Sequence, residues 1–574
     1  MKKYIIICMV LGCLFSACNE HDFLKEVPKD FMSEENSFVT ESDFDMAVND
    51  LYNLVRLEFY ANQENRPFDY IYGTDIVYDG EPGDIHRHSN MTAAYHPTSV
   101  IPKSHWDALY KIISSSNIIY ERVSSKDFSP ESIRQIQAKS LFFRGLSYRT
   151  LAYLYGGVPI VTEAIITPKT DFVRATKEET LKQAIEDVRF AAENLKDITE
   201  VKDGEISSCA AYHLLAELYL ATKQYQDAAE AATKVIENPT LALMNNRFGS
   251  RKEEAGKDVY WDLYRTNNQN RKSGNTEGIW VIQFETDIPG GGSSTLGNNL
   301  VGNYCGERHF SPMTRDAKID GTGAFLWPAS DYSGGRGVGW SVTTEHFNRT
   351  IWKSDYDNDM RNANHNFVRK IKVTKQEFID KFGIDTIDME HLPVGMVISS
   401  TSRPEIPRYL YPYQSKMTAL GDHPDALFAN VATGELKGAA GATYTDQYMF
   451  RLAETYLLRA EAYVGQNDLT KAAADINVVR ARAHANPVEA STVDLDYILD
   501  ERMRELGIEE KRRITLMRTG KLYERVMKYN PYYANPATNG DGVGMQEKYN
   551  LWPIPLSVIE ANTDAVLEQN PGYE

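Results

Sequence analysis

The sequence predicts a mainly α protein, built as a helical-repeat scaffold with long irregular loops and a few short strands. Pairs of helical segments with apolar inner faces recur along the chain at a similar register. Between them, a glycine- and aromatic-rich section shows no helical period. The composition, 574 residues of which 42% are hydrophobic and 25% charged, is that of a globular protein with a large core.

The N-terminus resembles a bacterial lipoprotein signal. A short positive start is followed by an apolar stretch, Tyr4 to Phe15, that is too short to span a bilayer, and small residues precede Cys18. We therefore expect residues 1–17 to be a signal peptide and Cys18 to carry the lipid. A competing cleavage box ends at Cys13, but it leaves an apolar stretch of about half the usual length. No later apolar stretch approaches membrane-spanning length, so the lipid is the expected anchor.

The clearest helical pair runs from Ser207 to Pro239, and a second pair with the same register runs from Tyr456 to Val479. Their aligned residues resemble those of tetratricopeptide units, in which small side chains let two antiparallel helices approach closely and aromatic rings fill the gap. These residues are Tyr212, Leu215, Ala216, Tyr219, Ala228 and Ala232 in the first pair, and Tyr456, Ala460, Tyr463, Ala472, Ile476 and Val479 in the second. Two looser pairs are each separated by an insertion: Ser42–Leu57 with Trp106–Val123, and Glu131–Tyr155 with Lys177–Leu195. We expect the pairs to stack on one shared core.

Two long segments lack any helical period and are predicted to be loops. One runs from Asp287 to Trp340, and the other is an insertion from Tyr70 to Pro102. Long loops in compact proteins are usually functional or disordered, and the many aromatic residues here argue against disorder. Gly278 to Phe284 is predicted as a short strand, and Ile387 to Tyr413 as further strand and loop.

Charge and cysteine content exclude two classes of protein. A net charge of −18 without a basic stripe argues against a nucleic-acid partner. Three of the five cysteines lie at or before Cys18, so Cys209 and Cys305 cannot form a disulfide framework. Cys209 lies in an apolar helical segment and is expected to be a buried thiol.

Four ordered segments share the residue pattern of a known protein family. They are Ala138 to Gly145 with the Gly-Gly-Val-Pro turn at Gly156 to Pro159, Phe450 to Ala462, Glu501 to Arg513, and the ending Trp552 to Pro555 with Gln569 to Tyr573. Together they resemble the RagB/SusD family from the N-terminal cysteine to the end of the chain. Gly507-Ile508 and Ile514-Thr515-Leu516 depart from the family pattern, but both lie in the scaffold.

The resemblance implies a glycan-binding lipoprotein of the outer membrane, exposed at the cell surface, that works with a SusC-like TonB-dependent transporter. It implies a lid that captures oligosaccharides above the barrel, with no cofactor and no catalysis. It also implies a single SusD-like domain over 18–574. We expect the helical scaffold at about 40–240 and 445–530, and the ligand region at about 70–102 and 285–440.

The family places its ligand site in these loops, and their residue types suit a sugar. Sugar rings stack on aromatic side chains, and their hydroxyl groups bond to carboxylate, amide and guanidinium groups. We expect Trp327, Tyr332 and Trp340 to be stacking platforms, with Asp75, Asp79, Arg87 and Asn90 as hydrogen-bonding partners. Further candidate ligand residues are Tyr78, Tyr95, Tyr304 and Arg336.

Catalytic and metal-binding patterns are weaker. Glu501, Glu505 and Glu509 recur at helical spacing beside arginines, which favours an ion-paired helix face over an acid/base pair. His86 and His88 are expected to be solvent-exposed loop residues. Asp355 to Asp359 lacks the glycine of a calcium loop and is expected to form an Asp/Arg turn near Arg361. No metal is expected.

Two alternative functions remain open at this stage. An anchored glycoside hydrolase needs two carboxylates facing each other across a cleft, about 5 to 9 Å apart. A protein-interaction scaffold would use the concave surface of the repeats for a peptide.

Overall fold

The computed structural model describes residues 38–573, except 63, 289–292, 296–302, 419 and 539–541. The predicted signal peptide and lipidation site, residues 1–17 and Cys18, lie outside the described residues. Within this range the structure is mainly α, with short strands in the middle of the chain. None of the described helices is both long and apolar enough to cross a membrane.

The longer helices come from the two ends of the chain. They are α3 (Glu41–Phe59), α5 (Val100–Ser124), α6 (Pro130–Tyr155), α7 (Lys177–Asn194), α8 (Ser208–Ala221), α9 (Tyr225–Ile236), α14 (Leu452–Gly465), α15 (Leu469–Arg482), α16 (Leu495–Glu505), α17 (Arg512–Arg518) and α18 (Leu522–Tyr529). Short helices are α4 (Met91–Ala94), α10 (Val259–Asp262), α11 (Gly306–Phe310), α12 (Glu345–Asn348), α13 (Gln376–Phe382), α19 (Pro531–Ala534) and α20 (Leu556–Ala561).

Local signals explain where several helices begin. Thr40 and Thr176 each form a capping box with the acidic residue three positions later, at the starts of α3 and α7. Ser129 caps α6, where Pro130 occupies the first turn, a position that suits proline.

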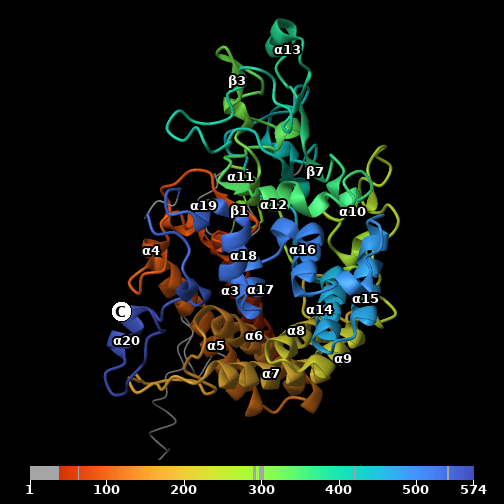
Figure 1. Cartoon of the computed structure of the whole chain (residues 1–574). Helices are drawn as coiled ribbons and strands as arrows, with labels where there is room; N and C mark the ends of the chain where they lie inside the picture. Colours follow the sequence, from red (N-terminus) through yellow and green to blue (C-terminus); the bar gives the residue numbers. More distant parts are fainter. Residues whose placement is uncertain are drawn as a thin grey trace, which may run out of the picture.

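The helices stack in an order that joins both ends of the chain. α5 packs on α6, α6 on α7, α7 on α8 and α8 on α9. α9 then packs on α14, and α14 on α15, so the C-terminal pair continues the N-terminal stack directly (Figure 1). The two predicted close pairs are confirmed as α8 with α9 and α14 with α15, and the looser pairs as α3 with α5 and α6 with α7.

The strands are short and all paired antiparallel. They are β1 (Val77–Asp79), β2 (Gly278–Ile282), β3 (Lys318–Ile319), β4 (Thr322–Gly323), β5 (Ala329–Ser330), β6 (Ser341–Thr343), β7 (Phe367–Val368), β8 (Lys370–Lys372), β9 (Thr386–Asp388), β10 (Tyr413–Gln414), β11 (Phe428–Asn430), β12 (Glu435–Leu436) and β13 (Gln447–Arg451). Their pairings are β1–β6, β2–β13, β3–β4, β7–β10, β8–β9 and β5–β12–β11.

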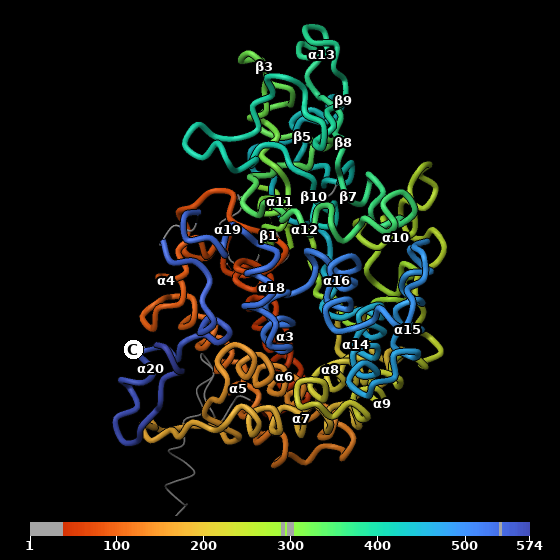
Figure 2. The backbone as a smooth tube through the Cα atoms, in the orientation of Figure 1, coloured from red at the N-terminus to blue at the C-terminus, as the bar shows by residue number. Residues whose placement is uncertain are grey.

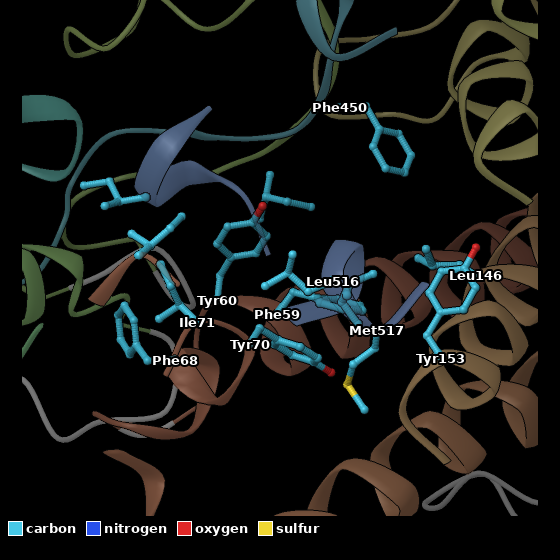
Figure 3. Packing of buried hydrophobic residues seen from close by; sticks show 14 of the residues in the cluster. Phe59, Tyr60, Phe68, Tyr70, Ile71, Leu146, Tyr153, Phe450, Leu516 and Met517 are labelled. Carbon is cyan, nitrogen blue, oxygen red and sulfur yellow. The ribbon is translucent and has the colours of Figure 1, made fainter. Parts of the chain in front are cut away.

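Most of these strands lie in a loop-rich lobe, residues 303–440, at the top of Figures 1 and 2, while the stacked helices form the base. One large core runs through the molecule and includes buried residues from α3, α6, β13 and α17. Figure 3 labels Phe59, Leu146, Phe450 and Leu516 from these elements among the residues of this cluster. The same cluster includes Phe310, Phe347 and Tyr413, so the ligand region predicted at 285–440 packs on the scaffold through a continuous interior.

Candidate functional site

Asp75 is fully buried where the 70–102 segment meets the C-terminal helices. Arg512 Nε and Nη2 donate to its two carboxylate oxygens over 2.9 and 2.8 Å, and Arg525 Nε donates over 2.5 Å. Burial alone would raise the pKa of Asp75, but the two guanidinium groups lower it well below its usual range. The Asp75 carboxylate therefore links the 70–102 segment to α17 and α18, and it is not accessible to a ligand.

Asp79, Arg87 and Trp340 are brought together beneath the surface. Pairing of β1 with β6 sets Asp79 opposite Ser341, next to Trp340. Arg87 Nε donates to Asp79 Oδ1 over 3.0 Å, and its guanidinium carbon lies 5.0 Å from the Trp340 ring centre. Burial raises the pKa of Asp79 to about 6 in spite of Arg87. Trp340 is only 7% exposed, and its Nε1 donates to Glu81 Oε2 over 2.8 Å.

Tyr95 and Tyr304 are also buried in packed positions. Arg513 Nη2 donates to the Tyr95 hydroxyl over 2.6 Å. The Tyr304 ring stacks on Phe68 with centres 5.3 Å apart. Asn90 is exposed, but its side chain accepts the Ala93 N–H over 2.8 Å as the cap of α4.

Tyr78 is half-buried and stands apart from the other predicted aromatics. Its ring stacks on Tyr532 at 5.2 Å, at the edge of a cleft of about 450 Å³ between β6, α12 and α19. The structure brings no other predicted ligand residue into that cleft.

Trp327 and Tyr332 are the predicted aromatics that face solvent. Their exposed fractions are 61% and 57%. The Arg315 guanidinium carbon lies 5.4 Å from the Trp327 ring centre. The preceding residue, Leu326, donates its N–H to Thr374 Oγ1 over 2.9 Å, which holds this loop against the segment after β8.

Tyr332 lines an open cleft of about 580 Å³ on the loop-rich lobe, which we call the Tyr332 cleft. Its walls come from 251–257, from 364–374 including β8, and from 413–433. The polar groups that line it include Arg251, Lys257, Asn364, His365, Lys370, Lys372 and Thr433. This volume is within the range of small-ligand sites, about 300–1,000 Å³. Among its described lining residues Glu254 is the one carboxylate, so the cleft lacks the facing pair that a glycosidase needs.

A buried charge network fixes the loop that carries Tyr332. His423 lies between Asp331 and Glu307, with Nδ1–Oδ1 and Nε2–Oε2 distances of 2.6 and 2.7 Å. Burial opposes the charged imidazole, but the two carboxylates raise the pKa of His423 to about 10, so both ring nitrogens donate. The Arg336 N–H donates to the free oxygen of Glu307 over 2.8 Å, and its guanidinium donates to the Gly438 carbonyl.

Gly434 lets a neighbouring turn pass close to the Tyr332 ring. Its φ is +70°, and a Cβ atom there would lie 2.6 Å from a ring carbon of Tyr332. The close approach of this turn, together with the His423 network, restricts the position of the Tyr332 ring.

The histidines of the 70–102 segment differ from their prediction as exposed loop residues. His88 is fully buried and His86 half-buried, and both contact Asp69, at 2.9 and 2.7 Å. The prediction was wrong because their shared partner, Asp69, lies in a different turn of the chain, so the sequence around the histidines does not reveal the contact. Within the described part of the chain, no group of three or more potential ligands is arranged to hold a metal ion.

The predicted ion pairs of Glu501 and Glu505 and the predicted buried thiol are confirmed, whereas Glu509 lies outside α16, in the turn Gly507–Glu509, and pairs with Arg451. Glu501 pairs with Arg361 at 2.8 Å, and Glu505 with Arg451 at 2.6 Å, so these carboxylates are buried in ion pairs. Arg361 also pairs with Asp359 at 2.7 Å, which forms the expected Asp/Arg turn. Cys209 is a buried thiol.

Sequence reasoning missed most of the Tyr332 cleft, including Arg251, Lys257, His365, Lys370 and Lys372. One signal was available. Lys370-Ile371-Lys372 alternates charged and apolar residues with the period of a half-buried strand, which places both lysines on one face.

Known proteins resemble this chain over its whole length. The SusD family profile matches residues 276–573, and a profile described as "Starch-binding associating with outer membrane" matches residues 22–220. A SusD-like protein of Formosa agariphila is 25% identical over 593 aligned positions, which cover 98% of each chain. The starch-binding protein SusD of Bacteroides thetaiotaomicron is 39% identical over 140 positions, 24% of each chain.

Solved structures share the fold. A laminarin-binding SusD-like protein superposes with a TM-score of 0.64 at 20% identity, over 93% of this chain and 99% of that chain. Surface glycan-binding protein A of Bacteroides thetaiotaomicron, solved with laminarihexaose, superposes with a TM-score of 0.61 at 18% identity, over 92% and 99%.

Proposed function

This chain belongs to the SusD family, and on that premise we propose that it is a surface lipoprotein that captures oligosaccharides and delivers them to a SusC-like transporter. The family description of starch binding in association with the outer membrane supports both the ligand class and the location. Laminarin and laminarihexaose binding by proteins of the same fold supports a glycan ligand.

The observation that carries the binding role is the exposure of two aromatic rings on the loop-rich lobe. Trp327 is exposed, whereas the other six tryptophans of the chain are at most 7% exposed, and Tyr332 is exposed beside an open cleft. Exposing a large ring to water loses the free energy of burial, so such rings commonly mark binding surfaces. A sugar ring that stacks on them would restore that burial.

We place the ligand at Trp327, Tyr332 and Arg336, with the Tyr332 cleft as its polar wall. The buried candidates Asp75, Asp79, Arg87, Tyr95, Tyr304 and Trp340 then support these loops from beneath. Asn90 is assigned to the cap of α4, and Tyr78 lies in the separate cleft beside Tyr532.

The protein is proposed to bind glycans without cleaving them. This follows from the single lining carboxylate of the Tyr332 cleft and from the engagement of Glu501 and Glu505 in buried ion pairs. The lipid on Cys18 would hold the protein at the outer membrane, in agreement with the family description.

A glycan array with the mature protein, followed by product analysis of each ligand that binds, tests this proposal. We expect binding to at least one class of oligosaccharide and no shortening of the chains after prolonged incubation. Release of shorter products would assign the protein to the hydrolases. Binding to no glycan would exclude the capture role.

A further inference from the structure

The charge of the Tyr332 cleft is opposite to that of the whole molecule. The chain carries a net charge of −18. The cleft is nevertheless lined by four cationic side chains, those of Arg251, Lys257, Lys370 and Lys372, against one carboxylate, that of Glu254. A cleft lined by one sign of charge concentrates ligands of the other sign.

Strand β8 supplies the outer half of this positive wall. Lys370 and Lys372 are exposed while Ile371 between them is buried, because side chains alternate across a strand. β8 packs against the turn Asp331–Ser333 that holds Tyr332. Lys370, Lys372 and Tyr332 all line the same cleft.

Nearby carboxylates neutralise this wall only in part. Glu254 lies 2.5 Å from Arg251 and 3.8 Å from Lys257. Asp388 lies 3.5 Å from Lys370, which is longer than a charge-assisted hydrogen bond of about 2.8 Å. Lys372 has no carboxylate within 4.0 Å among the described residues.

The carboxylates of Asp388, Asp422 and Asp258 lie near this wall but do not line the cleft. Asp422 lies 3.8 Å from Arg251, and Asp258 pairs with His365 at 2.6 Å. Among the described side chains that line the cleft itself, four cations therefore face one carboxylate, that of Glu254.

The surface around Trp327 repeats this pattern. Arg315, whose guanidinium lies over the Trp327 ring, and Arg336 have no carboxylate within 4.0 Å in the part of the chain that the structure describes. Burial lowers the pKa of Arg315 to about 10. The nearby carboxylate of Asp316 opposes this shift, and the positive charges of Arg336 and Arg408 add to it. Guanidinium groups without a carboxylate partner are well suited to sulfate and carboxylate ligands.

We infer that the ligand is an anionic glycan, an inference that rests on the proposed function. A sugar ring stacks on Tyr332, and its carboxylate or sulfate group lies in the Tyr332 cleft against Lys370 and Lys372. Arg315 and Arg336 meet a further anionic group of the same chain beside Trp327. Uronic-acid glycans and sulfated glycans share this chemistry, and the experiment separates them.

Matched pairs of probes give the test. Calorimetry on the whole mature protein compares oligogalacturonate with its methyl ester, and chondroitin sulfate oligosaccharides with their desulfated form, with laminarihexaose as a neutral reference. We expect the more negatively charged member of at least one pair to bind at least tenfold more tightly. We also expect its affinity to fall as salt rises from about 50 to 300 mM, because salt screens exposed charges. Desulfated chondroitin keeps its glucuronate carboxylates, so the chondroitin pair tests the sulfate group alone.

A double variant, Lys370→Gln with Lys372→Gln, connects this preference to the cleft. Each lost cation is expected to weaken binding of the charged probe about three- to tenfold, and binding of a neutral glycan hardly at all. Lys318→Gln with Lys353→Gln is the control, since it removes the same charge from exposed lysines that do not line the cleft. It should bind like the wild type.

The possible outcomes distinguish the inferred anionic ligand from the proposed glycan capture. Equal affinity for the two members of every pair, or equal binding by the double variant and its control, overturns the anionic ligand and leaves glycan capture in place. Failure to bind any saccharide, charged or neutral, overturns the proposed function itself. Preference within the galacturonate pair identifies a carboxylate ligand, and preference within the chondroitin pair a sulfate ligand.

Discussion

Trp327 and Trp340 lie in the same loop segment but differ in what surrounds them. Trp327 is 61% exposed, whereas Trp340 is 7% exposed and lies between the guanidinium groups of Arg87 and Arg308. Their roles should separate accordingly, since a ring can stack on a sugar only if one of its faces is accessible.

Alanine substitutions at Trp327, Tyr332 and Trp340 test this difference. Trp327→Ala and Tyr332→Ala should each weaken glycan affinity by roughly 1–3 kcal/mol, by analogy with bases stacked on aromatic side chains, and should leave the thermal midpoint unchanged. Trp340→Ala should instead lower the thermal midpoint, because removal of a buried ring typically costs about 3–5 kcal/mol. Calorimetry and thermal unfolding of the three variants measure both quantities. Wild-type affinity in both Trp327→Ala and Tyr332→Ala would move the site elsewhere.

Which loop residues are exposed could not be predicted from the sequence. Asp75 was expected to contact ligand, but its partners Arg512 and Arg525 lie 437 and 450 positions away. Nothing local to Asp75 reveals such contacts. The exposure of Trp327 and Tyr332 likewise depends on how distant loops pack. Residue type and loop position therefore predicted which segments form the ligand region, but not which of their side chains are exposed.

The charge on His423 makes the loop that carries Tyr332 sensitive to pH. In the folded protein the carboxylates of Asp331 and Glu307 raise the pKa of His423 to about 10, against about 6.5 for an unfolded chain. A raised folded-state pKa means that this stabilisation is complete below pH 6.5 and is lost as pH rises towards 10.

His423→Gln removes this contribution. We expect the variant to be less stable than the wild type at pH 6, and the difference to shrink steadily towards pH 10. Only the difference between the two proteins is informative, since other groups titrate over the same range. Burial lowers the pKa of Lys511 to about 7, for example, which makes stability rise with pH over that range. Denaturant unfolding at pH 6, 8 and 10 gives the comparison. A difference independent of pH would contradict a charged His423.

At the scale of elements, helices were predictable and their connections were not. α8, α9, α14 and α15 follow from a 3.6-residue period together with small residues at the contacts. The strands of the loop-rich lobe have two or three residues, which is too short to establish a period, and several of them pair with distant segments, as β5 does with β12. β8, whose alternation was visible in the sequence, is the exception.

Gly145 shows how closely two helices of the stack approach. It lies in α6, and a Cβ atom there would lie 2.5 Å from a methyl group of Val188 and 3.0 Å from the Ala184 carbonyl oxygen in α7. Alanine favours a helix interior by about 1 kcal/mol over glycine, but overpacking costs about 1–3 kcal/mol. Because part of the obstruction is backbone, the steric cost should be the larger effect.

Gly145→Ala should therefore lower the thermal midpoint in spite of its better helix propensity. Gly323→Ala is the control, since the one neighbour within 4 Å of its added carbon is the flexible end of Lys375 at 3.5 Å. Thermal unfolding followed by circular dichroism measures both variants. A higher midpoint for Gly145→Ala would show that α6 and α7 can separate at little cost.

At the scale of the molecule, the order of the helical stack explains why both ends of the chain carry family motifs. The turn after α6 and the ending near Trp552 meet through the Trp552 N–H, which donates to the Leu154 carbonyl over 2.6 Å. Segments that form one continuous scaffold constrain one another, so their patterns are recognisable from sequence. The loop-rich lobe packs on that scaffold but contributes none of its stacked helices. Its sequence agrees with a class of protein but does not identify a particular ligand.

The predicted lipid anchor determines where the protein is found. If Cys18 carries the lipid, Cys18→Ala should move the protein from the membrane to the soluble fraction, because no described helix could span a bilayer in its place. The variant should still bind glycans, since the cleft lies in another part of the chain. Fractionation and immunoblotting of cells that express each form provide the measurement. Unchanged membrane association of the Cys18→Ala protein would argue against lipidation at this residue.

The last prediction concerns the transporter. A binding protein held by a lipid cannot move its ligand across a membrane, so capture serves uptake only if the glycan passes to a pore. We expect a stable complex with a SusC-like barrel whose interface buries on the order of 2,000 Å² or more. Within that complex the loop-rich lobe should face the barrel lumen, because a site that faces outward would release glycan to the medium.

A single introduced thiol tests both the partner and its orientation. The native thiols of the described chain, Cys209 and Cys305, are buried, so Trp327→Cys creates a selectively reactive site on the lobe. Tagged protein purified from native outer membranes should bring a large TonB-dependent barrel with it. In that complex a bulky maleimide should label the new cysteine much more slowly than in the isolated protein. Recovery of the protein without a barrel would exclude the lid arrangement, and equal labelling in both forms would show that the lobe faces away from the pore.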